Sequence, residues 1–229
     1  MDLLYEGEQS KHITELGTIY CVGRNYVEHI HELGNEAPKD PIVFTKPYCA
    51  FRQGAYTALE YPPSTEDLQY EGELVLALRG NGRNIPAFST ADIIAGYAVG
   101  VDLTQRDLQN EAKKKGLPWC LSKGFDGSAQ VSHFVPFESC PPFDQLGFSL
   151  YVNNELRQRA YTNQMIFSPE MMVTYLSKTQ SMRTGDILFT GTPTGVGKLE
   201  IGDKIFMELH TLNPSEVLVD FHSEVIPWH

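Results

Sequence analysis

Two acidic residues, Glu71 and Glu73, interrupt a segment that otherwise has the composition of a buried β-strand, QYEGELVLAL over residues 69–78. Strand side chains alternate between faces, so these two carboxylates converge on one side. The apolar end of the segment predicts packing on both faces, and two like charges that converge in a core need a cation. Another acid, Asp102, lies near the end of a similar apolar run, GYAVGVDLT. Three oxygen donors without Cys or His suit Mg²⁺ or Mn²⁺.

A Glu-x-Glu pair is also typical of the solvated face of an antiparallel sheet. Three observations favour the metal site instead. The residues that follow Glu73 show no polar alternation, Gly72 permits close approach of a ligand or a second backbone, and Asp102 repeats the pattern. The solvated face remains the alternative.

A second group of polar side chains follows the predicted strand that ends at Val22. The segment GRNYVEHIHEL predicts a short helix in which His29 and Glu32 are three residues apart and share a face. A carboxylate beside a histidine fixes the ring tautomer and raises its basicity, as removal of a proton from water requires. Glu28 and His31 form another such pair, and a polar helix surface is the alternative for both.

A third group follows Asp102. If a helix begins near Thr104, then Arg106 and Gln109 line one side of the junction between strand and helix. Arginine suits a bidentate hold on a carboxylate, and glutamine donates to a carbonyl oxygen. We expect the adjacent run Lys113 to Lys115 to be solvated.

Lys123 lies between apolar residues, in the segment PWCLSKGF. Such a setting predicts a desolvated ammonium with a lowered pKa. A surface lysine whose stem packs on apolar side chains is the alternative.

A glycine-rich loop lies within TGDILFTGTPTGVGKLEIGD, residues 184–203. It is no Walker A loop, because Leu199 follows the Gly-Lys pair where that motif has Ser or Thr. Its backbone amides and the Thr192 hydroxyl still offer donors to an anion.

Strand-like runs outnumber helical ones along the chain. The predicted strands are Ile19 to Val22, Ile42 to Thr45, Leu74 to Leu78, Tyr97 to Leu103, Leu146 to Val152, Ile187 to Thr190, Lys204 to Leu209 and Val217 to Phe221. The predicted helices are Tyr26 to Leu33, Thr90 to Ile94 with Thr90 as its cap, Leu103 to Lys115, and Pro169 to Lys178 with Ser168 as its cap. The pattern predicts a mainly β, α+β domain rather than an alternating βαβ fold.

Composition narrows the function classes. The chain has 229 residues, enough for a sizeable core, and 18 basic against 29 acidic residues give a net charge of -11. This balance disfavours nucleic-acid binding. No stretch is apolar enough to span a membrane and the start lacks a signal peptide, so we expect a cytoplasmic protein, or an organellar one if a targeting segment has been removed. The four cysteines form no C-x-x-C pair, and we expect them to be small core side chains.

Taken together, the motifs resemble the fumarylacetoacetate hydrolase superfamily. They are CVGRNYVEHIHELG, the Lys-Pro pair at 46–47, EGELVLAL, GYAVGVDLTQRDLQ, KKKGLPWCLSKGFDGSAQVS, VNNELRQ and GDILFTGTPTGVG. The resemblance covers about residues 18 to 210 and is closest to short members that include acylpyruvate hydrolases and oxaloacetate decarboxylases. It implies a mixed β-sandwich roll with a pseudo-barrel, a homodimer, and one catalytic domain over residues 18–229 preceded by an extension or edge strand at 1–17.

The resemblance also implies a role for each candidate. Those roles are metal ligation by Glu71, Glu73 and Asp102, water activation by His29 and Glu32, oxyanion stabilisation by Lys123, and substrate contact by Arg24, Arg106, Gln109 and Thr192. Larger members supply a fourth upstream carboxylate, which CVGRNY lacks. Water or substrate must then complete the coordination.

The implied substrate is a 2-oxo acid that chelates Mg²⁺ or Mn²⁺ through a carboxylate oxygen and its 2-oxo oxygen. His29, assisted by Glu32, would deprotonate a water that attacks the distant carbonyl of a 2,4-dioxo acid. Carbon-carbon cleavage would leave a pyruvate enolate, whose charge the metal and Lys123 stabilise. We therefore expect an acylpyruvate or fumarylpyruvate hydrolase that yields pyruvate and a carboxylic acid.

Two alternatives stay open. Oxaloacetate decarboxylation, or isomerisation or tautomerisation of a 2-oxo acid, would use the same chelate without water attack. A non-enzymatic binding module would hold a structural ion such as Ca²⁺, but Lys123, Arg106 and the His29 pair would then have no common purpose.

Overall fold

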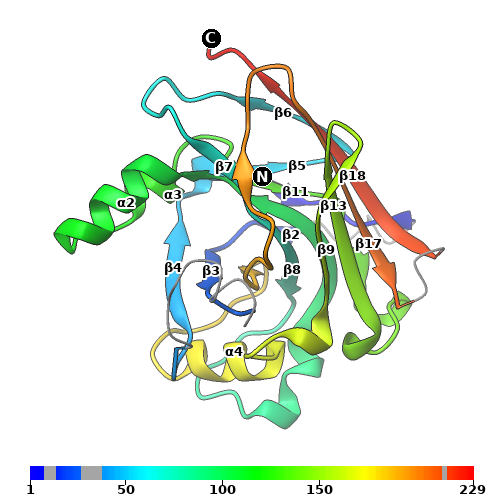
Figure 1. The fold of residues 1–229 in the computed structure, drawn as a ribbon. Helices are drawn as coiled ribbons and strands as arrows, with labels where there is room; N and C mark the ends of the chain where they lie inside the picture. The colour runs from blue at the N-terminus through cyan, green and yellow to red at the C-terminus, as the bar shows by residue number, and fades with distance from the viewer. Residues whose placement is uncertain (8–13, 27–37, 213–215) are drawn as a thin grey trace.

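The computed structural model describes residues 1–7, 14–26, 38–212 and 216–229 (Figure 1). Its larger sheet has eight strands, seven of them in the order β4, β3, β15, β8, β9, β11, β5, with β12 beside β9. In that order they are Ile42–Lys46, Ile19–Gly23, Ile187–Phe189, Gly72–Leu78, Ile94–Asp102, Ala129–Val131 and Phe51–Gln53, with β12 at Val135–Pro136. Pairing is mixed, since β15 runs parallel to β3 and β11 parallel to β5 while β8 and β9 are antiparallel.

A second sheet of five strands lies beside the larger sheet, and both curl (Figure 1). Its order is β14 (Glu155–Tyr161), β13 (Leu146–Val152), β17 (Lys204–Thr211), β18 (Val217–Ile226) and β6 (Tyr56–Glu60). A three-stranded sheet joins β10 (Thr104–Gln105), β7 (Leu68–Tyr70) and β16 (Gly197–Lys198), and a two-stranded one joins β1 (Asp2–Leu3) and β2 (Thr14–Glu15). The mainly β, α+β class is confirmed.

Strand β8 carries apolar side chains on both faces, as predicted. Leu74, Leu76 and Leu78 belong to the hydrophobic cluster that includes residues of the five-stranded sheet, whereas Val75 and Ala77 belong to a second cluster behind the larger sheet. Every residue of β8 is buried. A carboxylate placed at the end of this strand is therefore withdrawn from water.

The helices within the described residues are few and short. They are α2 (Arg106–Lys115), α3 (Cys120–Lys123) and α4 (Pro169–Ser177), with 3-10 turns at Tyr48–Ala50, Ala87–Ser89, Ala91–Ile93, Phe137–Ser139, Phe143–Gln145 and Thr162–Gln164. The prediction for α4 is confirmed, because the Ser168 hydroxyl accepts from the backbone N–H of Met171 and Pro169 occupies the first turn.

Three local predictions are wrong. The segment 90–94 forms a 3-10 turn that leads into β9, and the Thr90 hydroxyl donates to the Ala87 carbonyl instead of capping a helix. Helix α2 begins at Arg106, since the preceding Thr104–Gln105 pairs with β7. Cys49 and Cys120 are exposed, because one lies in a 3-10 turn and the other in the first turn of α3. Of the predicted helix 26–33, only Tyr26 lies within the described residues.

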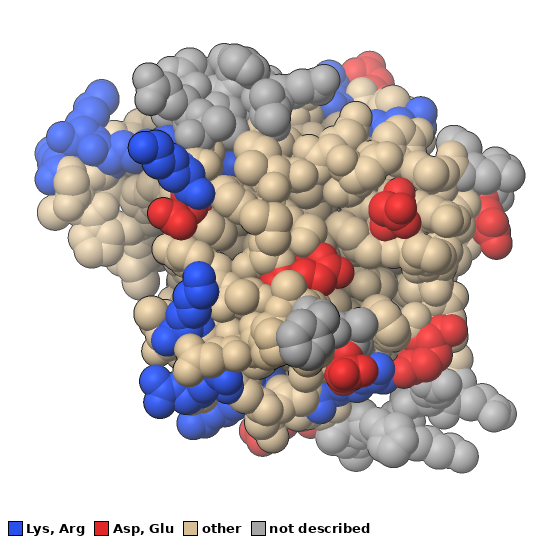
Figure 2. Space-filling view, turned by 90° about the horizontal axis from the view of Figure 1, so that it is seen from below, with Lys and Arg blue, Asp and Glu red and all other residues tan. Residues whose placement is uncertain are grey.

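Within the described part of the chain, no helix combines the length and apolar character that crossing a membrane requires. On the face drawn in Figure 2, Lys and Arg side chains lie mainly toward the side where α2 projects. Asp and Glu are spread over the rest of that face.

Candidate metal and substrate site

Glu71, Glu73 and Asp102 meet where β8 and β9 pair. Glu71 precedes β8, Glu73 is its second residue, and Asp102 ends β9. The antiparallel register sets Glu73 opposite Gly100, and the Asp102 N–H donates to the Glu71 carbonyl at 2.8 Å. One carboxylate oxygen from each acid lies within 4.8 Å of the others, and the three residues are 7%, 2% and 1% exposed. The predicted convergence is confirmed.

Gly72, between the two glutamates, packs against the second sheet. A Cβ atom there would lie 2.9 Å from Leu150 Cδ1 and 3.0 Å from Gln158 Oε1. The Gly72 N–H donates to that same Gln158 oxygen at 2.8 Å. The close approach predicted for this glycine is therefore made by side chains of the neighbouring sheet, which fix the backbone between the two acids.

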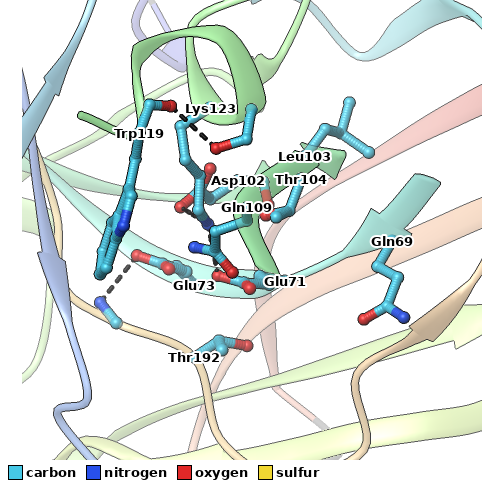
Figure 3. Close-up of polar contacts among 12 residues, drawn as sticks. Gln69, Glu71, Glu73, Asp102, Leu103, Thr104, Gln109, Trp119, Lys123 and Thr192 are labelled. Atoms are coloured by element: carbon cyan, nitrogen blue, oxygen red, sulfur yellow. Dashed lines mark hydrogen bonds and ion pairs between the residues drawn. The ribbon is translucent and has the colours of Figure 1, made fainter. Parts of the chain in front are cut away.

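Three cations contact the carboxylates. Lys123 Nζ donates to Glu71 Oε2 at 2.7 Å and to Asp102 Oδ2 at 2.6 Å. Arg106 forms an ion pair with the other oxygen of Glu71, and Lys46 Nζ lies 2.7 Å from Asp102 Oδ1. In Figure 3, Lys123 extends from its helix toward Asp102 and Glu71, with Trp119 to one side and Thr192 on the loop below. The site thus balances its own negative charge at two of the three acids.

The predicted lowering of the Lys123 pKa is wrong. Burial does favour the neutral amine, but the negative charges of Asp102 and Glu71 outweigh it and raise the pKa above its ordinary value. Sequence neighbours of Lys123 are apolar, whereas its spatial neighbours are acidic. The ammonium also lies 5.2 Å from the centre of the Phe44 ring.

Glu73 has a different environment from the other two acids. Its Oε2 accepts from the Gly191 N–H at 2.7 Å. Burial, followed by the charges of Asp102 and Glu71, raises the pKa of Glu73 well above its usual range. A divalent cation among the three acids would supply the positive charge that Glu73 lacks, and the donors are all hard oxygens, so the residues fit Mg²⁺ or Mn²⁺.

The candidate substrate residues line the same pocket as the three acids. Its lining includes Arg24, Arg106, Gln109, Lys123 and Thr192. Arg106 Nη1 donates to Gln109 Oε1 at 2.6 Å, so the helix presents the two side chains as a unit. The structure therefore brings together all the predicted site residues that it describes; His29 and Glu32 lie outside the described residues.

Arg24 adopts a left-handed backbone conformation, with φ of 61°. This conformation is unfavourable for residues other than glycine and is retained where the surroundings enforce it. The enforcing contacts come from Asn25, which is fully buried and donates to the carbonyls of Phe167 at 3.0 Å and Thr190 at 2.8 Å. Arg24 is thus held in the pocket wall by its neighbour.

Sequence reasoning missed four residues of the site. These residues are Lys46, Lys113, Trp119 and Gln158. Lys113 and Trp119 line the pocket, Lys46 pairs with Asp102, and Gln158 donates to Thr192. Lys113 had a usable signal, because it continues the helical spacing of Arg106 and Gln109. Lys114 and Lys115 are exposed, as expected of the whole run.

The chain is similar in sequence to several known proteins. The sequence model for the fumarylacetoacetate (FAA) hydrolase C-terminal family matches residues 18–220. Oxaloacetate tautomerase FAHD1, mitochondrial, of Bos taurus is 43% identical over 192 residues, 84% of this chain and 86% of that protein. Its namesake from Arabidopsis thaliana is 40% identical over 209 residues, covering 91% of this chain and 92% of the relative.

A solved structure provides a further similarity. The fumarylpyruvate hydrolase from Pseudomonas aeruginosa, in complex with Mn²⁺ and pyruvate, matches with a TM-score of 0.92 and 35% identity. The match covers 100% of this chain and 96% of that one.

Proposed function

Because this chain belongs to the fumarylacetoacetate hydrolase family, we propose that it is a metal-dependent enzyme that hydrolyses a carbon-carbon bond in a 2,4-dioxo acid. The substrate is of the acylpyruvate or fumarylpyruvate type, and water and the dioxo acid give pyruvate and a carboxylic acid. The observation that carries the proposal is the meeting of three buried carboxylates with Lys123 and Arg106 in one pocket.

Glu71, Glu73 and Asp102 would hold Mg²⁺ or Mn²⁺. When bound, such an ion acts as a Lewis acid that polarises the 2-oxo carbonyl. The Mn²⁺ and pyruvate in the related fumarylpyruvate hydrolase support this assignment.

The remaining side chains bind the substrate and stabilise its developing charge. Lys123 carries an ammonium at the carboxylate cluster and would donate to an enolate oxygen. Arg106 and Gln109 offer donors from one face of α2, and the Thr192 hydroxyl offers one from the opposite loop. Cleavage of the carbon-carbon bond leaves negative charge on the substrate, which these donors would stabilise.

Water activation is assigned to His29 assisted by Glu32. Replacing His29 by Ala should lower turnover of an acylpyruvate by about 10²- to 10⁴-fold while Mn²⁺ affinity stays unchanged. His31→Ala, in the other His-Glu pair, is the matched control. Unchanged turnover in the His29 variant, with metal binding intact, would show that the hydrolytic assignment is wrong.

Oxaloacetate is the second candidate substrate, because the curated relatives at 40–43% identity are named oxaloacetate tautomerases. Tautomerisation or decarboxylation of oxaloacetate also passes through an enolate, but it needs no attacking water. A panel of oxaloacetate, acetylpyruvate and fumarylpyruvate, assayed with Mg²⁺ or Mn²⁺, separates the reactions. Turnover of oxaloacetate alone would favour the second candidate, and no turnover at all would favour a binding module.

Assembly and location remain proposals. We propose a homodimer, which light scattering on the purified protein would test. The cytoplasmic location expected above stays a prediction, and the mitochondrial names of the relatives make cell fractionation its direct test.

A further inference from the structure

One face of α2 carries more positive charge than the carboxylate cluster uses. Arg106, Gln109 and Lys113 have the spacing i, i+3 and i+7, so they form one stripe along the helix. All three line the pocket. With a rise of 1.5 Å per residue, Lys113 lies about 10 Å farther along the helix axis than Arg106. The stripe therefore runs from the carboxylate cluster outward.

The Lys113 ammonium lies over the Trp119 indole, 5.5 Å from the ring centre. The residue is exposed as a whole, yet loss of water around its ammonium, followed by the nearby charge of Arg106, lowers its pKa to about 8. A lysine on an open helix surface would not experience this. The indole face and the pocket wall thus hold the ammonium in a place where it is partly deprived of water.

The charges of the described residues do not account for Lys113. The cluster already holds three cations for its three acids, because Lys46, Arg106 and Lys123 pair with Asp102 and Glu71. Within the described part of the chain, neither Lys113 nor Arg24 forms an ion pair, although both line the pocket. A divalent ion would add to this positive excess. An anionic ligand with more than one charge would offset it.

We propose that Lys113, together with Arg24, binds the second carboxylate of a dicarboxylic 2-oxo acid and makes the site selective for such substrates over monocarboxylic ones. This inference rests on the proposed function, in that the first carboxylate and the 2-oxo group must be held at the Glu71–Glu73–Asp102 cluster. Within the substrates named above, it selects fumarylpyruvate and oxaloacetate over acetylpyruvate.

Calorimetric binding to the Mn²⁺-loaded protein tests the inference without reading turnover. The ligands are 2-oxoglutarate and 2-oxoadipate, each compared with the monocarboxylic acid of the same chain length, 2-oxopentanoate and 2-oxohexanoate. We expect at least one dicarboxylic acid to bind about tenfold more tightly than its counterpart, and Lys113→Met to remove most of that preference. Lys113→Arg should retain it. Lys114→Met, at the exposed neighbouring position, is the matched control and should change nothing.

Equal affinities within both pairs would overturn the inference, as would a preference that survives in Lys113→Met. The proposed hydrolysis fails separately. An inactive protein with a Lys113-dependent preference would support the carboxylate subsite and contradict the proposed hydrolysis. An active enzyme with equal affinities would support the hydrolysis and contradict the subsite.

Discussion

Gln158 Nε2 donates to the hydroxyl of Thr192 at 2.8 Å, while Oε1 of the same side chain accepts from the Gly72 N–H, also at 2.8 Å. Gln158 lies on β14 in the five-stranded sheet and is 1% exposed. One buried amide therefore joins the backbone between the two glutamates to the loop on the other side of the pocket. The separation between the carboxylate cluster and the Thr192 hydroxyl therefore depends on a side chain of β14.

Replacing Gln158 by Leu should destabilise the protein and weaken metal binding together. The Gly72 N–H would be left buried without an acceptor, at a cost of about 1–3 kcal/mol in the free energy of unfolding. Because Gly72 lies between Glu71 and Glu73, we also expect weaker Mn²⁺ binding by calorimetry. Arg157→Ala, whose side chain pairs with exposed Glu155, is the control on the same strand. A stable variant with unchanged Mn²⁺ affinity would contradict this positioning role.

The ammonium of Lys46 forms a buried ion pair with the carboxylate of Asp102. It also donates to the carbonyls of Lys123 and Ser128. Lys46→Met removes one member of a buried ion pair, so we expect unfolding to become easier by about 3–5 kcal/mol in a urea titration. Lys204→Met, at an exposed end of β17, should have little effect. A loss below about 1 kcal/mol would show that Lys46 adds little to the cluster.

The carboxylate cluster could be predicted because its signal is local. Strand alternation sets Glu71 and Glu73 on one side, and the apolar residues after them indicate burial without any knowledge of the partner strands. Asp102 has the same kind of context. Whether Asp102 reaches the other two acids depends on the β8–β9 register. The sequence does not specify this register, but the expected burial of all three acids favours one in which they meet.

Contacts between distant segments could not be predicted in this way. Gln158 reaches the site from the second sheet, and its outward neighbour Leu156 is apolar and 47% exposed, which obscures the alternation of β14. The sequence predicts the wrong direction for the pKa of Lys123, because the acids that contact its ammonium, Glu71 just before β8 and Asp102 at the end of β9, are distant in the chain. Lys113 begins a run of three lysines, and the two that follow it are exposed, so the sequence alone predicts a solvated Lys113 as well.

Glu73→Gln tests the metal site with the least change of shape. The amide oxygen can still accept from Gly191, but one negative charge is lost from the cluster, so Mn²⁺ should bind at least tenfold more weakly. The rise in melting temperature that Mn²⁺ produces should shrink accordingly. Glu200→Gln, an exposed acid paired with Lys198, is the control. An unchanged Mn²⁺ affinity in Glu73→Gln would exclude Glu73 as a ligand.

Binding of a dicarboxylic 2-oxo acid should depend on pH through Lys113. Its pKa is lowered to about 8, so the ammonium is charged below that pH and becomes neutral above it. The charged groups that act on it are Arg106, Glu71, Arg24 and Lys123. A bound carboxylate favours the charged form, so the pKa is higher in the complex and the preference should begin to fall near pH 8 and decline further as the pH rises. Calorimetry with Mg²⁺ between pH 6 and 10 would measure the ratio of 2-oxoglutarate to 2-oxopentanoate affinity. In Lys113→Met the ratio should stay low and constant, and a high, constant ratio in the unmodified protein up to pH 10 would rule out this role of Lys113.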